Sequence, residues 1–215
     1  MKSMHFVPHS KSSGFTLVEL LVSISIFAVV TGLVLAKYQS FNGGIILTNM
    51  AYEVALTIRQ AQSYGINVRQ QGNIFSISYG VHFEKNGTNP IKSFILFSDA
   101  LSCDTTGSLD CVGDGLYRPG TGDALVDTFI LGRGITIEKY CIGSNIANPS
   151  SEVCSNNSSS ADTVDISFNR PDPSAIILGA GGVGNNSYAR IRLIASDRKT
   201  IRDVIVLGTG QISIQ

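Results

Sequence analysis

The N-terminal part of the chain contains an unbroken apolar run, from Phe15 to Ala36, in which Glu19 is the only charged residue. A helix of these 22 residues, rising about 1.5 Å per residue, is about 33 Å long and matches the hydrocarbon core of one bilayer. The run is longer than the apolar region of an ordinary secretory signal. The sequence therefore predicts a transmembrane segment at residues 15–36.

A second helical pattern follows, because apolar residues recur at intervals of three and four while polar residues occupy the other faces. The apolar positions are Leu47, Ala51, Val54, Ala55, Ile58 and Ala61. Gly43 and Gly44 separate the two patterns, and each weakens a helix by about 1 kcal/mol relative to Ala. They predict a bend or a locally melted turn within an N-terminal helix that covers residues 15–66 and ends near Gly65.

From residue 67 to Gln215 the pattern changes to short apolar or alternating runs between turn residues, which is typical of β-strands. The runs cover residues 74–83, 91–98, 125–131, 135–142, 163–169, 174–179, 188–196, 201–208 and 211–215. The polar stretch at 150–162 predicts a loop. A helix with one apolar face needs a partner surface, and an antiparallel sheet provides one. We therefore predict an α+β fold: a long N-terminal helix, with a transmembrane half and an amphipathic half, packed on an antiparallel β-rich head at residues 67–215.

Composition adds little to this picture. Hydrophobic residues make up 43% of the chain and charged residues 15%, which suits one membrane segment and one globular domain. The 16 basic residues balance the 16 acidic ones, so no whole-chain charge favours nucleic acid or an anionic surface as a partner. Any such partner has to be recognised by a local patch.

All cysteines lie beyond the apolar run, in polar, loop-like sequence: Cys103, Cys111, Cys141 and Cys154. An even number of cysteines outside the cytoplasm indicates disulfides, and three pairings are possible. We favour Cys103 with Cys111 and Cys141 with Cys154, because each bond would close a short polar excursion. The spacing does not match a zinc site.

The stretch "GFTLVE", which begins at Gly14, follows a short leader with Lys2 and Lys11 and opens the apolar run. It resembles the class III signal of type IV pilins and type II secretion pseudopilins. The resemblance implies a leader peptide at residues 1–14, cleavage after Gly14 by a prepilin peptidase, and methylation of the new N-terminus at Phe15. It also implies a role for Glu19 in assembly, since this family pairs the carboxylate at that position with the amine of a neighbouring subunit. An ion pair in apolar surroundings costs much less than a lone charge.

The strict resemblance covers only residues 14–36. The closing strands, from Tyr188 onward, are more weakly similar to FimT-type and H-type minor pilins and pseudopilins. Ala36 stands where major pilins of the type IVa class have a proline that bends the helix. We expect a structural subunit of the minor rather than the major class, and we do not expect an enzyme.

The function implied by the resemblance is that of a structural subunit of a type IV pilus-like filament. A type II secretion pseudopilin is one alternative, and a FimT-type minor pilin that binds DNA for uptake is another. The implied partners are other pilin or pseudopilin subunits, the prepilin peptidase, an inner-membrane assembly platform and, before assembly, membrane lipid. The implied location is a single pass through the cytoplasmic membrane with the head outside the cytoplasm, followed by an extracellular or periplasmic filament.

The DNA alternative depends on a cluster of cations near the C-terminus: Arg190, Arg192, Arg198, Lys199 and Arg202. Arg190 and Arg192 alternate with apolar residues, so on a strand both project from one face. Such a patch is a candidate contact for DNA phosphates. The competing interpretation is a solvated sheet face whose charges keep an edge strand from aggregating.

Two further patterns are candidate ligand sites. Aspartates around a glycine turn, Asp110, Asp114 and Asp123, are candidate calcium ligands, although an EF-type loop that starts at Asp110 lacks two of the expected ligands. The glycines of "GAGGVG", from Gly179 to Gly184, resemble a dinucleotide fingerprint, but the sequence after them alternates like a strand instead of forming a helix. We interpret them as a turn.

No catalytic constellation is visible in the sequence. His82 is the only histidine left after removal of the leader, and it lies among strand residues. We interpret it as a packing or surface residue, because nothing in the sequence places a nucleophile beside it.

Overall fold

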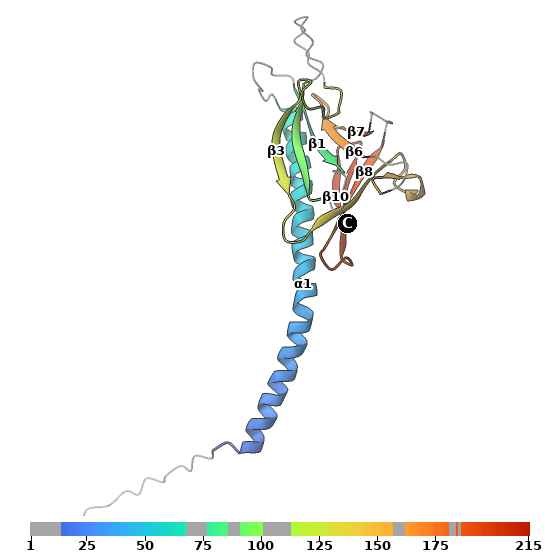
Figure 1. Ribbon diagram of the computed structural model, residues 1–215. Helices are drawn as coiled ribbons and strands as arrows, with labels where there is room; N and C mark the ends of the chain where they lie inside the picture. The colour runs from blue at the N-terminus through green and yellow to red at the C-terminus, as the bar shows by residue number, and fades with distance from the viewer. Residues whose placement is uncertain are drawn as a thin grey trace, which may run out of the picture. The chain divides into compact units, whose positions relative to one another are not determined.

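The structure is a computed structural model that describes residues 14–67, 77–85, 91–100, 113–156, 162–180, 184 and 186–215. Its internal contacts divide the chain into two compact units, Met1–Phe41 and Asn42–Gln215. Helix α1, Leu17–Ile66, passes through both units, and two antiparallel five-stranded sheets belong to the second (Figure 1). The predicted α+β fold with a β-rich head is confirmed.

Helix α1 is continuous through Gly43 and Gly44, so the prediction of a locally melted turn there is wrong. The hydroxyl of Thr48 donates a hydrogen bond to the Gly44 carbonyl at 2.9 Å, within an unbroken helical segment. Extending an existing helix fixes one residue for each hydrogen bond gained, and two glycines do not cancel that gain. The predicted end of the helix near Gly65 is confirmed, since α1 ends at Ile66.

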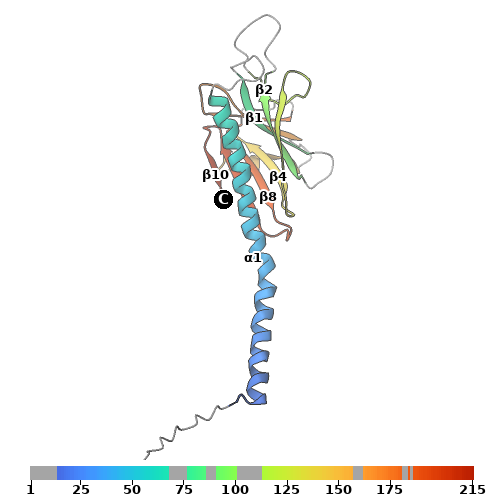
Figure 2. The ribbon, with the colours of Figure 1, turned by 90° about the vertical axis from the view of Figure 1, so that its left-hand side faces the viewer.

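The part of α1 that lies in the second unit buries one face against the sheets (Figure 2). All six predicted apolar positions are buried and belong to the main core: Leu47, Ala51, Val54, Ala55, Ile58 and Ala61. The Gln62 side-chain amide donates to the carbonyls of Pro173 and Gly210, at 2.9 and 3.1 Å. The amphipathic half of the helix is thereby fixed to the head by both apolar packing and polar contacts.

The first sheet has the order β3-β2-β1-β6-β7 and the second the order β10-β9-β8-β4-β5. Every named pair of strands is antiparallel. The strands of the first sheet are β1 Ser78–Glu84, β2 Ser93–Asp99, β3 Ala124–Ile130, β6 Thr163–Phe168 and β7 Ala175–Gly179. Those of the second are β4 Thr136–Gly143, β5 Val153–Cys154, β8 Tyr188–Ile194, β9 Ile201–Leu207 and β10 Ile212–Ile214.

Successive side chains of a strand point to opposite faces of its sheet, and both sheets place apolar residues on the face toward α1. In β8, Ala189, Ile191 and Leu193 belong to the main core, so Arg190 and Arg192 lie on the opposite face, as predicted. In the first sheet, strands β1, β2 and β6 are buried on both faces, whereas the edge strand β3 is largely exposed. The outer face of this sheet carries polar residues of β1, β2 and β6, and residues 113–118 lie over them.

The interpretation of residues 150–162 as a plain polar loop is wrong in its first half. A short 3-10 helix, η1 Pro149–Ser151, leads into β5, which pairs with β4 at Cys141 and Ile142. A strand of two residues has no alternation that a sequence can reveal, because it exists through its partner strand. Residues 157–161 lie outside the described residues.

Candidate functional site

The N-terminal residues that were singled out from the sequence lie at the start of α1. Phe15 is 80% exposed, and no atom lies within 4 Å of the position of a Cβ at Gly14. Glu19 is in the first turn, and its backbone N–H donates to the Thr16 hydroxyl at 3.3 Å. This bond is one half of a capping box, for which Thr16 and Glu19 form the typical T-x-x-E sequence. A carboxylate in a first helical turn is also favoured by the helix dipole.

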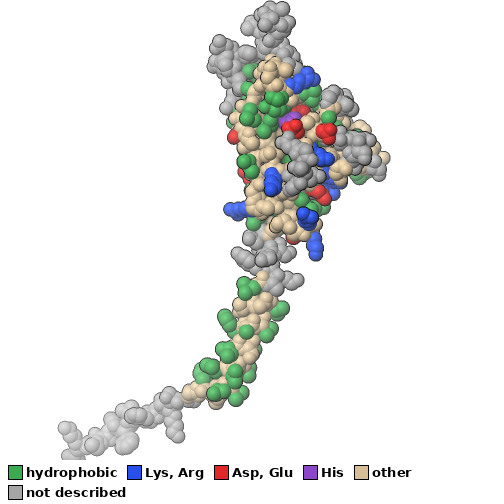
Figure 3. All heavy atoms as spheres, in the orientation of Figure 1, with side chains coloured by type: hydrophobic (Ala, Val, Ile, Leu, Met, Phe, Trp, Pro, Cys, Tyr) green, Lys and Arg blue, Asp and Glu red, His purple; other side chains and the backbone are tan. Residues whose placement is uncertain are grey.

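The helix beyond Glu19 is apolar on all sides. Residues Leu17–Leu35 have a mean hydropathy of 2.4, none of this span is buried, and its length and composition suit a membrane crossing. Hydrophobic side chains dominate this stretch in the space-filling view, whereas charged side chains appear over the head (Figure 3). The hydroxyls of Ser23 and Ser25 donate to the carbonyls four residues earlier, at 2.8 and 2.7 Å, so they need no water.

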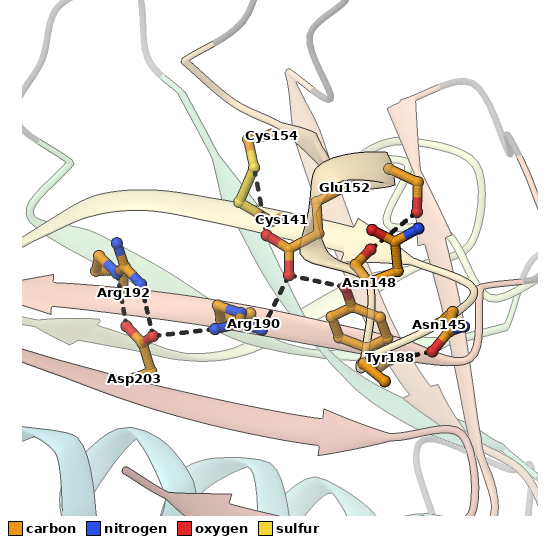
Figure 4. A network of polar contacts seen from close by, with 11 residues as sticks. Cys141, Asn145, Asn148, Glu152, Cys154, Tyr188, Arg190, Arg192 and Asp203 are labelled. Carbon is orange, nitrogen blue, oxygen red and sulfur yellow. Dashed lines mark hydrogen bonds and ion pairs between the residues drawn. A yellow bond between two sulfur atoms is a disulfide. The ribbon is translucent and has the colours of Figure 1, made fainter.

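A polar network lies on the outer face of the second sheet, at the arginines that were predicted as DNA contacts (Figure 4). The Arg192 guanidinium makes two hydrogen bonds to the Asp203 carboxylate, both 2.8 Å long. Arg190 lies 3.4 Å from Asp203 and 3.0 Å from Glu152. Burial alone would raise the pKa of Asp203, but the hydrogen bonds and charge of Arg192 hold it below its usual range. The two arginines are therefore neutralised by carboxylates of this chain.

Glu152 reaches this network because the segment after η1 is held at both sides. The Tyr188 hydroxyl donates to Glu152 at 2.7 Å, and burial together with this carboxylate raises the pKa of Tyr188 to about 12. Two residues along the chain, Cys154 faces Cys141 across the β4–β5 pair, and their sulfur atoms lie 1.97 Å apart, at disulfide distance. Cys103 and Cys111, the other favoured pair, lie outside the described residues.

The remaining predicted cations are not joined to this network. Arg198 and Lys199 are exposed in the turn between β8 and β9, where Asp197 accepts the backbone N–H groups of Lys199 and Thr200. The Arg202 guanidinium donates to the carbonyl of Ile201. The structure does not bring the five cations together into one free basic surface.

Sequence reasoning missed a buried polar cluster under residues 113–118. His82 Nδ1 lies 2.7 Å from Asp165 Oδ1, and both side chains are almost fully buried. Burial raises the pKa of Asp165, while its hydrogen bond with His82 lowers it. The same carboxylate oxygen accepts the backbone N–H of Tyr117 at 3.2 Å. Among the described residues no serine or cysteine side chain is hydrogen-bonded to His82.

A second carboxylate, Asp99, fixes the same segment by accepting the Gly115 N–H at 2.7 Å. Its Oδ2 accepts this hydrogen bond, whereas its Oδ1 is buried and has no hydrogen-bond partner among the described residues. Burial, reinforced by the negative charges of Asp123 and Asp114, raises the pKa of Asp99 to about 7. A signal for this cluster existed in β6, where Asp165 and Ser167 alternate with apolar residues in a strand that is buried on both faces.

The predicted calcium ligands serve turns in the structure. Asp114 accepts the Leu116 N–H and pairs with Arg118, and Asp123 accepts the backbone N–H groups of Ala100 and Arg118. Asp110 lies outside the described residues. Within the described part of the chain, the one group of three possible metal ligands is Cys141, Glu152 and Cys154, and its two sulfur atoms are bonded to each other. A strand, β8, and not a helix follows the glycine-rich stretch, whose residues 181–183 lie outside the described residues.

Comparison with known proteins bears on the N-terminus. Residues 9–35 match the family model described as the prokaryotic N-terminal methylation motif. The chain carries a pilin-type processing signal. No curated protein and no solved structure matches the chain. The motif indicates a pilin-like protein that a prepilin peptidase processes, and the apolar helix behind it fits an inner-membrane anchor.

Proposed function

We propose that the chain is a structural, minor subunit of a type IV pilus-like filament. The observation that supports this proposal is the methylation motif at residues 9–35, a range that includes Gly14, Phe15 and Glu19 and the exposed apolar helix behind them. Before assembly the helix lies in lipid. During assembly it moves into a core of packed helices, which exchanges one apolar environment for another at little cost.

In this mechanism the leader, residues 1–14, is removed and the new amine at Phe15 is methylated. The Glu19 carboxylate of one subunit then meets the amine of a neighbour. A correct register satisfies both charges, whereas an incorrect register leaves each charge in apolar surroundings. A pseudopilin of a type II secretion system would use the same physics with different machinery, and a secretion defect without surface filaments after gene deletion would favour that alternative.

The first experiment measures processing. We expect the intact mass of the membrane-extracted protein to correspond to a chain that begins at methylated Phe15. That chain has lost Lys2 and Lys11 and no acidic residue, so its balance is 14 basic (16 − 2) against 16 acidic residues. A mature protein that begins at Met1, or one cut after the apolar span, would refute the proposal.

The second experiment measures assembly through Glu19. We expect Glu19→Leu to insert into the membrane at wild-type level and to be lost from sheared surface filaments, because the neighbouring amine then lacks its counter-charge. Ser23→Leu, one turn further along the same helix, is the matched control and should assemble normally. Normal recovery of Glu19→Leu in filaments would show that its carboxylate does not direct assembly.

No observation favours the DNA-binding alternative over the structural one. A phosphate that approached Arg190 or Arg192 would have to compete with Glu152 and Asp203, which already hold both guanidinium groups. Displacing them would leave buried carboxylates without partners. The structural subunit is therefore the function that the geometry supports best.

A further inference from the structure

Two arginines of the head have a backbone conformation that normally favours glycine. Arg133 has φ = 56° and Arg198 has φ = 54°, and no other non-glycine residue in the described part of the chain has a positive φ. Arg133 and Gly134, both at positive φ, form a turn that is closed by a hydrogen bond from the Ile135 N–H to the Gly132 carbonyl. Asn-Gly is the pair that such a turn prefers. An arginine retained in a strained conformation is a candidate for a function of its charge.

The two turns that carry these arginines lie against each other. Arg198 is in the turn between β8 and β9, and a Cβ at Gly134 would lie 3.1 Å from the Cβ of Ser196 in that turn. Lys92 joins them, because its carbonyl accepts the Leu131 N–H at 2.8 Å and its side chain lines a cleft of about 550 Å³ together with Ser196 and Arg198. We call the exposed cations of these segments the basic end: Lys92, Arg133, Arg198 and Lys199.

The charges of the basic end are not neutralised by the head itself. None of its four cations has an ion-pair partner among the described residues. The acidic residues beside it are Glu138, which lines the same cleft, and Asp197, which accepts the backbone N–H groups of Lys199 and Thr200. Ile130, which is 76% exposed, ends β3 next to these cations. Basic residues around an exposed apolar side chain are typical of surfaces that lie on anionic membranes.

The basic end lies where α1 enters the head. The opposite end of β9 is fixed beside Gln62, whose side chain donates to the Gly210 carbonyl. From there β9 extends about 23 Å, the length of about 15 helical residues, to the turn that carries Arg198. Tyr52 lines the groove between α1 and β10, so this edge of the sheet follows the helix toward its N-terminal side. Figures 1 and 2 show the turn between β8 and β9, drawn in red, at the end of the head from which α1 leads back to Asn42.

The length of the chain ties this end of the head to the membrane. The apolar span ends at Leu35, and the second compact unit begins at Asn42, seven positions later. Seven residues reach about 10 Å as a helix and at most about 25 Å as an extended chain. The polar headgroup layer of a bilayer is itself about 5–7 Å thick. Under the proposed function, headgroups are therefore within reach of the basic end before assembly.

We propose that the basic end lies on the anionic lipid headgroups of the membrane that holds the apolar helix. Its guanidinium and ammonium groups bind the headgroup phosphates, and the contact restricts the tilt of the head until the subunit is assembled. This inference rests on the proposed function, which puts the helix in the membrane, and extends it by a contact of the head. Nucleic acid offers phosphates too, but only the membrane is tethered to this end by the chain.

The contact is tested with the full-length protein in bilayer nanodiscs that contain a lipid with a spin-labelled headgroup. Ser196→Cys, in the turn beside Arg198, carries a fluorophore that the spin label quenches at short range. We expect stronger quenching in nanodiscs of phosphatidylglycerol and phosphatidylcholine than in phosphatidylcholine alone, and the difference should shrink as salt rises. The matched control is Thr209→Cys, an exposed residue beyond the opposite end of β9, and its quenching should be weak in both lipids. The parent chain without an added cysteine sets the background.

Removal of charge without strain tests the two arginines. Arg133→Asn and Arg198→Asn delete the guanidinium groups, and Asn tolerates a positive φ better than Arg does. Each should lower the ratio of membrane-bound to free heads about fivefold, the effect of one cation near an anionic surface, and the double variant about 25-fold. Both should melt at or above the wild-type temperature, so unfolding does not explain the loss. Arg59→Gln, which removes an exposed cation at the other end of the head, is the charge control and should leave the quenching unchanged.

Three results would overturn the contact. They are equal quenching of the Ser196→Cys label in anionic and neutral nanodiscs, undiminished quenching in the double variant, and binding of a DNA oligonucleotide that the double variant weakens while quenching does not depend on the lipid. The third would assign the basic end to nucleic acid. Filament recovery of the parent chain is measured separately in cells. Absence of the parent from filaments would refute the proposed function whatever the nanodiscs show, so the two failures are distinguishable.

Discussion

Asp99 provides the sharpest test of the buried cluster under residues 113–118. Its side chain is fully buried, and its pKa is raised by burial and by the nearby carboxylates of Asp123 and Asp114. Replacing it by Asn keeps an oxygen that can accept the Gly115 N–H but removes the ionisable group. The variant therefore separates the hydrogen bond from the charge.

The size of the effect follows from the two pKa values. Asp99 has a pKa near 3.8 in an unfolded chain and about 7 in the folded one. Below pH 3.8 both states are protonated, and the contribution of this group to stability is fully present. As the pH rises toward 7 the unfolded state releases its proton first, so the contribution is progressively lost and is gone above pH 7. At 1.36 kcal/mol per pKa unit, the loss amounts to at most about 4 kcal/mol.

The assay is thermal unfolding of the full-length protein in detergent, followed by the near-ultraviolet circular dichroism of its tyrosines at fixed pH values. At pH 8 we expect Asp99→Asn to melt several degrees above the wild type. At pH 4.5 we expect it to melt at the same temperature or lower, because the new amide N–H groups lie where Oδ1 has no partner among the described residues.

Glu53→Gln, which changes an exposed carboxylate on α1, is the control for a general effect of removing one negative charge. At each pH the melting temperature of the wild type is compared with that of Asp99→Asn. This difference isolates Asp99, because the other carboxylates are the same in both proteins. If the melting temperatures of the two proteins change with pH by the same amount between pH 4.5 and 8, Asp99 does not carry a raised pKa.

Three further outcomes are expected. The double variant Cys141→Ser/Cys154→Ser should lose about 2–4 kcal/mol of unfolding free energy, because opening a loop of this length relaxes the unfolded chain, and an unchanged urea midpoint would contradict this. Gly65→Ala should destabilise the fold by about 1–3 kcal/mol, since the new Cβ would overlap the Phe168 carbonyl, whereas Gly44→Ala has open space around the new Cβ and should stabilise it by about 0.5–1 kcal/mol. Equal melting temperatures of the two variants would contradict this prediction. DNA retention by the full-length protein across a salt series should have the same slope in wild type and in Arg190→Ala, and a flatter slope in the variant would revive the DNA hypothesis.

What the sequence could predict is what short stretches determine by themselves. The apolar run behind Gly14 and the three- and four-residue spacing of Leu47 to Ala61 fix a helix and its buried face with no knowledge of the partner. The strand runs were found for the same reason, because alternation within five to eight residues is a local signal. The end of β1, predicted at Phe83, is observed one residue later at Glu84, and the predicted start at Ile74 lies outside the described residues.

The polar clusters could not be predicted because their members are far apart in the sequence. His82 meets Asp165 only because β1 pairs with β6 in the register that sets these two residues opposite each other. A shift by one residue would send His82 to the other face. Glu152 reaches Arg190 through a two-residue strand. The sequence made the arginines look like a free basic patch. Asp203 was visible near them, but nothing showed that Glu152, 38 residues before Arg190, also contacts Arg190.

The position of Glu19 within α1 explains how an apolar helix can carry a carboxylate at low cost. Since α1 begins at Leu17, the carboxylate lies in the first turn, at the end of the membrane span and not at its centre. There the helix dipole favours it and its backbone N–H is satisfied by Thr16, and under the proposed function the polar headgroups of the membrane are within reach of its side chain. Its cost in lipid is therefore below the about 2.5–3.5 kcal/mol of a charge at the bilayer centre. The carboxylate becomes expensive only when the helix leaves the membrane surface for a filament core. Under the proposed function its selective effect thus acts at assembly, where an incorrect register would bury it without an amine, and insertion is left nearly undisturbed.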